Sequence, residues 1–307
     1  MKSFLKFSFF LFFLSAFTGL QAQQVDKKSL LNNLEYLSSD DFKGRKTGTE
    51  ENLRARKYLI EKFNEIGLTT HYKNHEQFFS FESRRSPDPI EGVNVEGFIA
   101  GSESRKLIVI TAHFDHVGIG RAVEGDSIYN GADDNASGTA ALLALAEYFK
   151  KNRPKHSMIF VALDAEEMGL QGARALVNDF PFPLEDIVLN INMDMISRND
   201  NGELYASGTY QNPTFKPILE AVSRGQKPSL KFGHDLPNTG RDDWSKSSDH
   251  GAFLEKGVPH IYFGVEDHKD YHKPSDEFGN IQPDFYFDAV NLILKCAIAL
   301  DQNLLKE

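Results

Sequence analysis

The chain has 307 residues, with 44 acidic side chains against 34 basic ones, a formal net charge of −10 and a single cysteine. So acidic a balance argues against nucleic acid and anionic membranes as partners. The lone cysteine, Cys296, excludes an intramolecular disulfide, and its apolar neighbours in LILKCAIAL predict a buried position in a helix.

The first residues have the pattern of a secretory signal peptide. Two lysines give a positive start, residues 7–20 are almost all apolar, and Ala22 offers a small residue for cleavage. The apolar stretch is shorter than the ~20 residues that a membrane-spanning helix needs. We therefore expect residues 1–22 to be removed, and the protein to be secreted or periplasmic without stable membrane association. Residues 23–307 are long enough for one large domain.

Two helices are expected before the first strand. Apolar residues recur with helical period in residues 29–37 and again in residues 50–66. Thr49 can cap the start of the second helix, and Gly67 can end it. The following residues, 69–99, are polar and strand-prone.

Three runs of mostly apolar, β-favouring residues come next: KLIVITAH (106–113), SMIFVALD (157–164) and IVLNINMD (187–194). Continuous runs of this kind fit central strands that are buried on both faces. Residues 139–151 lie between the first two runs and are apolar nearly all round, which predicts a buried helix. A strand, a helix and a strand at this spacing predict a right-handed crossover and a parallel pair of strands.

The last third of the chain adds a fourth strand candidate, HIYFG (260–264), and a closing helix at residues 285–305. Residues 225–250 are rich in Gly, Pro and Asp and predict a long loop, a kind of segment that often carries function. We see no repeat or linker that would mark a second domain. The expected fold is an α/β single domain with a central mixed, largely parallel β-sheet flanked by helices.

Each of the three central strands ends in side chains that can bind metal. In chain order these are His113 and Asp115, then Asp164, Glu166 and Glu167, and then Asp194. Two further candidates are Asp134 in GADDNASG and His272 in DYHKPSDE. Ligands of an open α/β sheet bind beyond the carboxyl ends of its strands, so these groups are expected to converge. Their nitrogen and oxygen donors suit Zn²⁺, with Mn²⁺ or Co²⁺ as possible substitutes, and their number predicts a pair of ions.

Five motifs in a fixed order resemble those of a known enzyme family: AHFDH, GADDNASG, DAEEMGLQGA, NMDM and YHKPSDE. They are similar to the motifs of the di-zinc aminopeptidase family that includes aminopeptidase Y and the secreted bacterial leucyl aminopeptidases. The similarity starts at YLSSDDFKGRKTGT and spans most of the chain after the leader. It implies a zinc-exopeptidase-like α/β/α sandwich for residues 23–307, which would form a metallopeptidase catalytic domain.

The resemblance also implies a role for each matching residue. His113 and Asp194 would be the terminal ligands of one zinc ion. Glu167 and His272 would be the terminal ligands of the other zinc ion, and Asp134 would be shared between the two.

Four more roles follow from the same resemblance and from position in the chain. Glu166 would be the general base, which takes a proton from a metal-bridged water and later delivers it to the leaving amine. Tyr271 matches a tyrosine that in some relatives donates a hydrogen bond to the developing oxyanion. Asp115 is placed to orient the imidazole of His113, and Asp276 could orient the imidazole next to Tyr271.

For other residues near these motifs, the sequence allows either a role in the site or an ordinary structural role. Trp244, with Arg241 and Asp242, is either part of a substrate wall or an anchor for the long loop. Asp249 is expected to line the site. The histidines fall into two groups. His116 and His250 either line the site or belong to ordinary loop structure, whereas the histidines expected to be exposed are His71, His75, His156 and His234.

We therefore expect a metallo-aminopeptidase that acts on peptides with a free N-terminus and has no nucleic-acid partner and no obligate protein partner. The main alternative is a glutaminyl cyclase-type aminoacyltransferase, since such enzymes share the fold and work with one zinc ion. A carboxypeptidase acting on acidic dipeptides and a non-catalytic binding protein on a peptidase scaffold are further alternatives. The full GADDNASG and DAEEMG pattern favours hydrolysis over cyclisation, and Glu166 with the complete ligand list argues against a binding protein.

Overall fold

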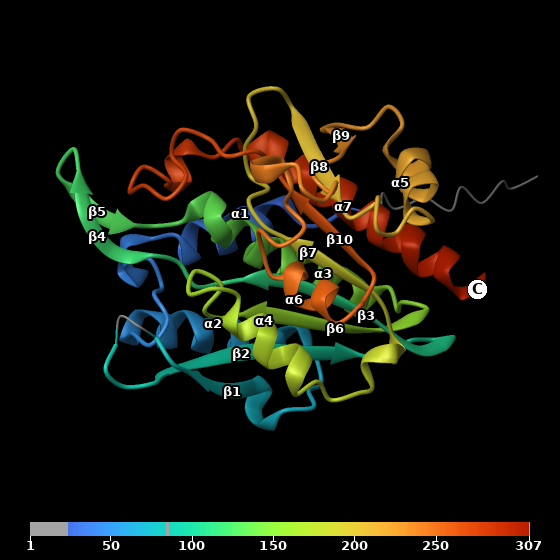
Figure 1. Ribbon diagram of the computed structural model, residues 1–307, viewed down its shortest axis with the longest axis horizontal. Helices are drawn as coiled ribbons and strands as arrows, with labels where there is room; N and C mark the ends of the chain where they lie inside the picture. Colours follow the sequence, from blue (N-terminus) through green and yellow to red (C-terminus); the bar gives the residue numbers. More distant parts are fainter. Residues whose placement is uncertain (1–23, 84–85, 307) are drawn as a thin grey trace, which may run out of the picture.

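The computed structural model describes residues 24–83 and 86–306 (Figure 1). The expected signal peptide, residues 1–22, lies outside this described part. None of the helices found in it is both long and apolar enough to cross a membrane.

A mixed sheet of eight strands runs through the centre of the described part (Figure 1). Its strands are, in spatial order, β1 (Glu76–Phe81), β2 (Ile90–Ile99), β6 (His156–Leu163), β3 (Ser104–His113), β7 (Ile187–Met193), β10 (His260–Gly264), β8 (Glu203–Ser207) and β9 (Ser229–Phe232). The central strands β6, β3, β7 and β10 are parallel to one another. Antiparallel pairs join β1 to β2, β2 to β6 and β10 to β8. The mixed sheet predicted from the sequence is confirmed.

The central strands are buried on both faces, as their continuous apolar sequences predict. All eight residues of β6 are buried. In β3, Ile108 and Ile110 pack into the core on one face of the sheet, while Leu107 and Val109 pack into the core on the other. This alternation follows from the two-residue period of a strand. A strand with apolar side chains on both faces therefore requires a layer of helices on each side.

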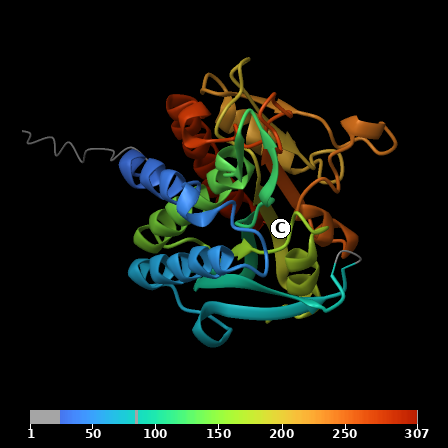
Figure 2. The ribbon, with the colours of Figure 1, turned by 90° about the vertical axis from the view of Figure 1, so that its left-hand side faces the viewer.

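Helices supply these two layers, which Figure 2 shows with the sheet between them. One layer consists of α1 (Lys27–Leu37), α2 (Glu50–Ile66), α3 (Gly138–Lys151) and α7 (Pro283–Asn303), with α5 (Phe215–Ser223) packed on α7. The other layer consists of α4 (Gln171–Asn178) and α6 (His250–Glu255). The expected α/β/α sandwich is confirmed.

Local sequence signals set the ends of several helices. The hydroxyl of Thr49 accepts a hydrogen bond from the backbone N–H of Asn52 at the start of α2, and Gly67 ends the helix with a φ of 81°. That backbone conformation costs glycine little. In α3 most residues are buried, as its apolar sequence predicts, and Cys296 is fully buried in α7.

The predicted long loop at residues 225–250 is partly wrong. It contains the strand β9 and a single helical turn at Gly240–Asp242. The strand has only four residues and pairs in parallel with β8, so its formation depends on a partner that lies elsewhere in the sequence. A separate hairpin of β4 (Gly118–Val123) and β5 (Asp126–Tyr129) was not expected either, and it projects from one end of the molecule (Figure 1).

Two histidines that were expected to be exposed are buried, His75 and His156. Nδ1 of His75 lies 2.7 Å from the backbone oxygen of Glu96. Nδ1 of His156 lies 2.9 Å from a carboxylate oxygen of Asp301 in α7. Each imidazole has a polar partner from a distant part of the chain, and this partner makes its burial possible.

Candidate metal centre

Three neighbouring parallel strands end at one edge of the sheet, and each supplies polar side chains there. β3 ends at His113, while Asp164 follows the end of β6 and Asp194 follows the end of β7. The three strands lie side by side in the order β6, β3, β7. The carboxyl edge of the sheet therefore collects the strand ends, as the sequence predicted. The carboxylate of Asp164 does not join the metal-binding groups, because it accepts hydrogen bonds from Thr47, Asn52 and Val93.

The first donor set consists of His113, Asp134 and Asp194. Nε2 of His113 lies 3.2 Å from Oδ1 of Asp194 and 3.4 Å from Oδ1 of Asp134. All three side chains are buried, and their donor atoms lie close enough together to surround one metal ion.

The second donor set consists of Asp134, Glu167 and His272. Nε2 of His272 lies 3.1 Å from Oδ2 of Asp134 and 3.3 Å from Oε2 of Glu167. Asp134 thus turns Oδ1 towards His113 and Oδ2 towards His272, which is the placement of a shared ligand. The two sets together contain all five residues that the resemblance implied as ligands.

The separations between donor atoms fit divalent zinc. A four-coordinate zinc ion with bonds of ~2.0–2.1 Å holds its ligand atoms about 3.3 Å apart. The four distances measured within the two donor sets lie between 3.1 and 3.4 Å. Imidazole nitrogen and carboxylate oxygen are also the donor types that zinc takes.

A further histidine lies beside the second donor set. Nδ1 of His116 is 2.7 Å from Oε1 of Glu167 and 3.8 Å from Oδ2 of Asp134, and the ring is buried. The sequence left His116 between a site role and ordinary loop structure. The signal was its position three residues after His113, where the chain has just left β3.

The turn that carries the paired glutamates is held by Asp115. Its carboxylate accepts hydrogen bonds from the backbone N–H groups of Glu166, at 3.0 Å, and Glu167, at 3.3 Å. Nδ1 of His113 lies 3.1 Å from the backbone oxygen of Asp115 and 3.7 Å from its carboxylate. Asp115 thus contacts the imidazole of His113 chiefly through its backbone carbonyl. Its carboxylate instead holds the backbone of the two glutamates.

Arg45 joins the two loops on either side of the first donor set. Its guanidinium is fully buried and donates hydrogen bonds to the backbone oxygens of Phe114 at 2.8 Å, Asn130 at 2.6 Å and Gly131 at 3.0 Å. Sequence analysis did not single out this residue. Its only signal was a lone arginine in the glycine-containing loop FKGRKTGT.

Asp276 was expected to orient His272, but its hydrogen bonds go to the loop that carries Asp134. It accepts them from the backbone N–H groups of Asp133, at 2.9 Å, and Asp134, at 3.0 Å. Nε2 of His268 lies 3.0 Å from the carboxylate of Asp133. These contacts tie the segment that carries His272 to the segment that carries the shared carboxylate.

The electrostatics of the site favour a bound cation. Burial alone raises the pKa of Asp134, but the imidazoles of His116, His113 and His272 together hold that pKa well below its usual value. Burial opposes protonation of His113, yet Asp194 and Glu166 raise the pKa of its imidazole well above the usual value. Protons on the histidines thus offset the crowded carboxylates, and a divalent cation would take their place.

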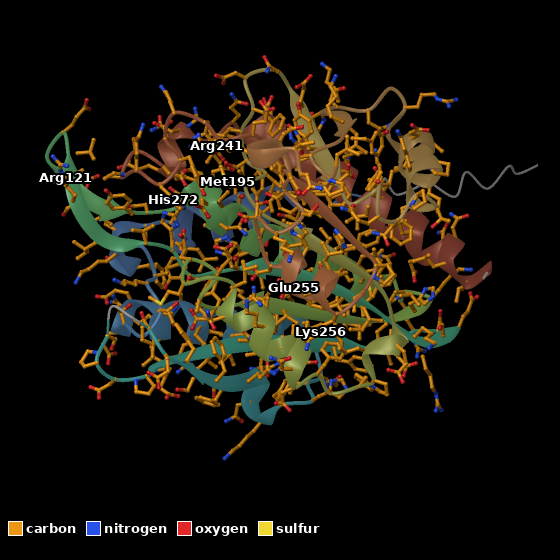
Figure 3. All side chains as sticks on the ribbon, viewed as in Figure 1. Arg121, Met195, Arg241, Glu255, Lys256 and His272 are labelled. Carbon is orange, nitrogen blue, oxygen red and sulfur yellow. The ribbon has the colours of Figure 1, made fainter. Side chains whose placement is uncertain are left out.

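A cavity of about 100 Å³ opens beside the two donor sets. Its lining residues are Asp134, Glu166, Glu167, Asp194, Met195, Trp244, Ser247, Tyr262, Val265, Asp267, Tyr271 and His272. Met195 and His272 are labelled in Figure 3 and lie close together on the ribbon. A larger hollow of about 950 Å³ lies at the amino ends of the same parallel strands, at the opposite edge of the sheet from these groups.

Trp244 forms a fixed wall of the 100 Å³ cavity. Its ring stacks on His234 with centres 3.7 Å apart, and its backbone N–H donates to the backbone oxygen of His234 at 2.7 Å. Nε2 of His250 lies 2.9 Å from the backbone oxygen of Trp244. Tyr262, which the sequence did not mark, stands at 6.0 Å from the tryptophan ring and donates a hydrogen bond to the backbone oxygen of Asp194. Trp244 both lines the pocket and anchors its loop.

The site consists of two sets of imidazole and carboxylate groups that share one carboxylate, and it lies at the carboxyl edge of an α/β sheet. Such an arrangement is typical of metal-dependent hydrolases. Residues 94–297 match the model of Peptidase family M28, and the chain belongs to this family.

One relative by sequence is a "Probable zinc metalloprotease" of Pyrenophora tritici-repentis, 26% identical over 250 residues. The match covers 71% of this chain and 57% of that protein, so the chain spans little more than half of the relative's length. Two solved structures share the fold. A leucine aminopeptidase precursor from Bacteroides thetaiotaomicron has a TM-score of 0.72 at 18% identity, and the match covers 89% of this chain and 96% of that one. A glutaminyl cyclase from Porphyromonas gingivalis has a TM-score of 0.72 at 15% identity, with 89% and 98% covered.

Proposed function

We propose that the protein is a zinc-dependent aminopeptidase that removes N-terminal residues from peptides. The charge of the cavity beside the donor sets carries this proposal. Among the described residues that line it are five carboxylates and no lysine or arginine. Three of these carboxylates belong to the donor sets, and Glu166 and Asp267 remain outside them. Such a lining attracts the ammonium group of a peptide N-terminus and repels a C-terminal or side-chain carboxylate. It therefore favours an aminopeptidase over a carboxypeptidase for acidic dipeptides.

The two donor sets are proposed to hold one zinc ion each, with Asp134 shared. When bound, the ions would polarise the scissile carbonyl and make a coordinated water more acidic. The protein's own part is to hold the substrate amine near the carboxylates that bind no metal, Glu166 and Asp267, and to place the scissile carbonyl at the open side of the cavity.

Glu166 is proposed as the general base. It lines the cavity, and burial raises the pKa of its carboxyl well above the usual value, with His113 opposing and Asp249 adding to the rise. A carboxylate with a raised pKa takes a proton from water more readily, and can return that proton to the nitrogen of the departing amine. Tyr271 also lines the cavity, and burial raises the pKa of its phenol, so the hydroxyl keeps its proton and can donate a hydrogen bond to the oxyanion.

The test uses purified protein before and after removal of metal with a chelator, with zinc added back. The substrates are a panel of aminoacyl fluorogenic amides, the same peptides with acetylated N-termini, and an N-terminal glutaminyl peptide. Glu166→Ala is compared with Glu61→Ala, which removes an exposed carboxylate of α2. We expect zinc-dependent release of free amino acids from unblocked peptides only. Glu166→Ala should lose about 10²–10⁴-fold in kcat and keep its metal, while Glu61→Ala should behave as the wild type.

Other outcomes identify the alternatives. Cyclisation of the glutaminyl peptide without hydrolysis would make the protein a glutaminyl cyclase-type enzyme. Equal cleavage of acetylated peptides would contradict an aminopeptidase. Metal binding without turnover of any substrate would support a binding protein on a peptidase scaffold.

We also propose that the protein is exported. The support is the charged and then apolar sequence of residues 1–22, with Ala22 as the cleavage residue. Intact mass and N-terminal sequencing of protein recovered outside the cytoplasm should show a chain that starts near residue 23. Recovery of the uncleaved chain from the cytoplasm alone would contradict export.

A further inference from the structure

His116 is a buried histidine whose side chain makes no hydrogen bond within the described residues. Neither Nδ1 nor Nε2 has a partner of acceptable geometry, and Oε1 of Glu167, at 2.7 Å from Nδ1, lacks one as well. Buried polar atoms are rarely left in this state, because each costs free energy unless something satisfies it. Two such atoms that face each other on a carboxylate and an imidazole are both potential metal ligands.

The ring of His116 is held in this place by its surroundings. Gly131 has a φ of +60°, and a Cβ atom there would lie 2.6 Å from Cγ and Cδ2 of the imidazole. Only glycine therefore lets the loop before Asp134 pass over the ring. On another side the ring makes an edge contact with His272, with centres 5.7 Å apart. The chain thus packs an imidazole without a hydrogen bond against the second donor set, where its charged neighbours are Glu167 and Asp134.

We propose that His116 is a fourth protein ligand of the second donor set, beside Asp134, Glu167 and His272. The inference rests on the proposed metal site. Donor atoms from His116, Asp134 and Glu167 lie close enough together to hold one ion. Nδ1 of His116 lies 3.8 Å from Oδ2 of Asp134 and 2.7 Å from Oε1 of Glu167, above and below the separation of about 3.3 Å for a tetrahedral zinc ion. A bound ion would draw the first pair together and separate the second.

This assignment makes the two metal positions unequal. The second set has two nitrogen and two oxygen donors, which is the number that a closed structural zinc site uses, whereas the first set has three and stays open, as catalytic zinc sites do. The second position should therefore bind metal more tightly and fill first. The first position should bind more weakly and keep room for a water or a substrate oxygen.

The test measures metal binding alone. Metal-free protein is titrated with Co²⁺ and with Zn²⁺ against a competing chelator, and the metal-bound state is followed by Co²⁺ absorption. His116→Phe keeps a ring of similar shape that cannot bind metal, and His116→Ala guards against a poor fit of phenylalanine. The control is His156→Phe, which removes a buried and hydrogen-bonded imidazole at the amino end of β6.

We expect two ions per wild-type chain, the first bound more tightly. Both His116 variants should lose at least 10-fold in affinity at the tight position and show altered Co²⁺ absorption. Without metal, both variants should melt only slightly lower than the wild type, because they lose the contact between His116 and Glu167. With metal, their melting temperatures should fall further, because a metal ligand is lost as well. His156→Phe should melt lower without metal and bind Co²⁺ as the wild type does.

Unchanged affinity in both His116 variants would overturn the assignment and leave the aminopeptidase proposal standing. A fall in metal-free melting temperature as large as the fall with metal would also overturn it, because the role of His116 would then be structural. Failure of the wild-type protein to bind either ion would overturn both this inference and the proposed function.

Discussion

At the residue scale, the paired glutamates show how neighbours acquire different tasks. Asp115 accepts hydrogen bonds from the backbone N–H groups of both Glu166 and Glu167, so the turn is fixed through its backbone and each side chain can take a different direction. The carboxylate of Glu167 faces His116 and His272. That of Glu166 lines the cavity, where no hydrogen-bonding residue holds it in the described structure.

Arg45 should contribute strongly to stability, because its buried guanidinium satisfies backbone oxygens of both site loops. Arg45→Met would leave these acceptors unpaired in the interior, so we expect a loss of ~3 kcal/mol or more in the free energy of unfolding. Urea unfolding measures this loss. Arg54→Met, which removes an exposed guanidinium, should change the free energy of unfolding by no more than ~0.5 kcal/mol. Equal effects of the two changes would contradict the role of Arg45.

Trp244 should set the size of the N-terminal side chain that the cavity accepts. A cavity of about 100 Å³ is smaller than the ~150 Å³ that holds a benzene ring. The wild type should therefore prefer small N-terminal residues such as alanine. Trp244→Ala should raise kcat/KM for leucyl and phenylalanyl amides relative to the alanyl amide by about 10-fold or more. Tyr210→Ala, at an exposed aromatic residue, should leave the ratio unchanged, and an unchanged ratio in Trp244→Ala would contradict the prediction.

At the scale of elements, the order β6, β3, β7 brings the site together. The spatial order of these strands differs from their order in the chain, since β3 lies between two strands, β6 and β7, that both follow it in the sequence. Their parallel direction places three strand ends at one edge. Other site residues lie outside the sheet: Asp134 in a short helical segment, Ala132–Ser137, directly before α3, and His272 in the loop between β10 and α7.

The packing of α6 on β10 should make stability depend on pH. His250 and His260 are buried with ring centres 5.3 Å apart. Burial, and after it the charge of His260, lowers the pKa of His250 from 6.5 to about 3. Burial also lowers the pKa of His260, from 6.5 to about 4. The unfolded chain binds protons at these histidines below pH 6.5 and the folded chain does not. Their stabilising contribution is therefore complete above pH 6.5 and falls with pH, by ~1 kcal/mol per pH unit per histidine, down to the folded pKa.

Comparison of the wild type with His260→Leu isolates this contribution. The buried carboxyls of Asp164 and Asp249 act in the opposite direction, because burial raises their pKa values to about 7 and about 8. They are common to both proteins and cancel in the difference. Between pH 6.5 and pH 4.5 the variant should lose less stability in urea unfolding than the wild type, by about 1 kcal/mol per pH unit. Parallel pH profiles of the two proteins would contradict the burial of a neutral His260.

At the scale of the whole molecule, the protein has an excess of acidic side chains, and several of them are gathered at the metal centre. The chain carries ten more acidic than basic side chains, and the metal centre gathers several of the carboxylates in its interior. Like charges in a buried site destabilise the fold unless a cation or protons offset them.

Removal of metal should therefore lower the stability of the entire domain. An ion present at 100 times its Kd contributes ~2.7 kcal/mol, because it binds the folded chain only. Chelation should lower the melting temperature, and zinc should restore it. Asp134→Asn removes the shared carboxylate, so its melting temperature should respond little to either treatment. A wild-type melting temperature that chelation leaves unchanged would contradict a metal-stabilised fold.

The sequence by itself determined the α/β class, the central strands, the helices α2 and α3, and the convergence of His113, Glu167 and Asp194. Continuous apolar runs, caps and strand ends are local signals, and parallel strands must end at one edge. Only the tertiary structure decided the partners of isolated polar residues. The carbonyls around Arg45, the imidazole of His116 beside Glu167 and the tryptophan wall are contacts between distant segments, and no local periodicity records them. For the same reason the short strand β9 and the burial of His75 and His156 could not be predicted from the sequence.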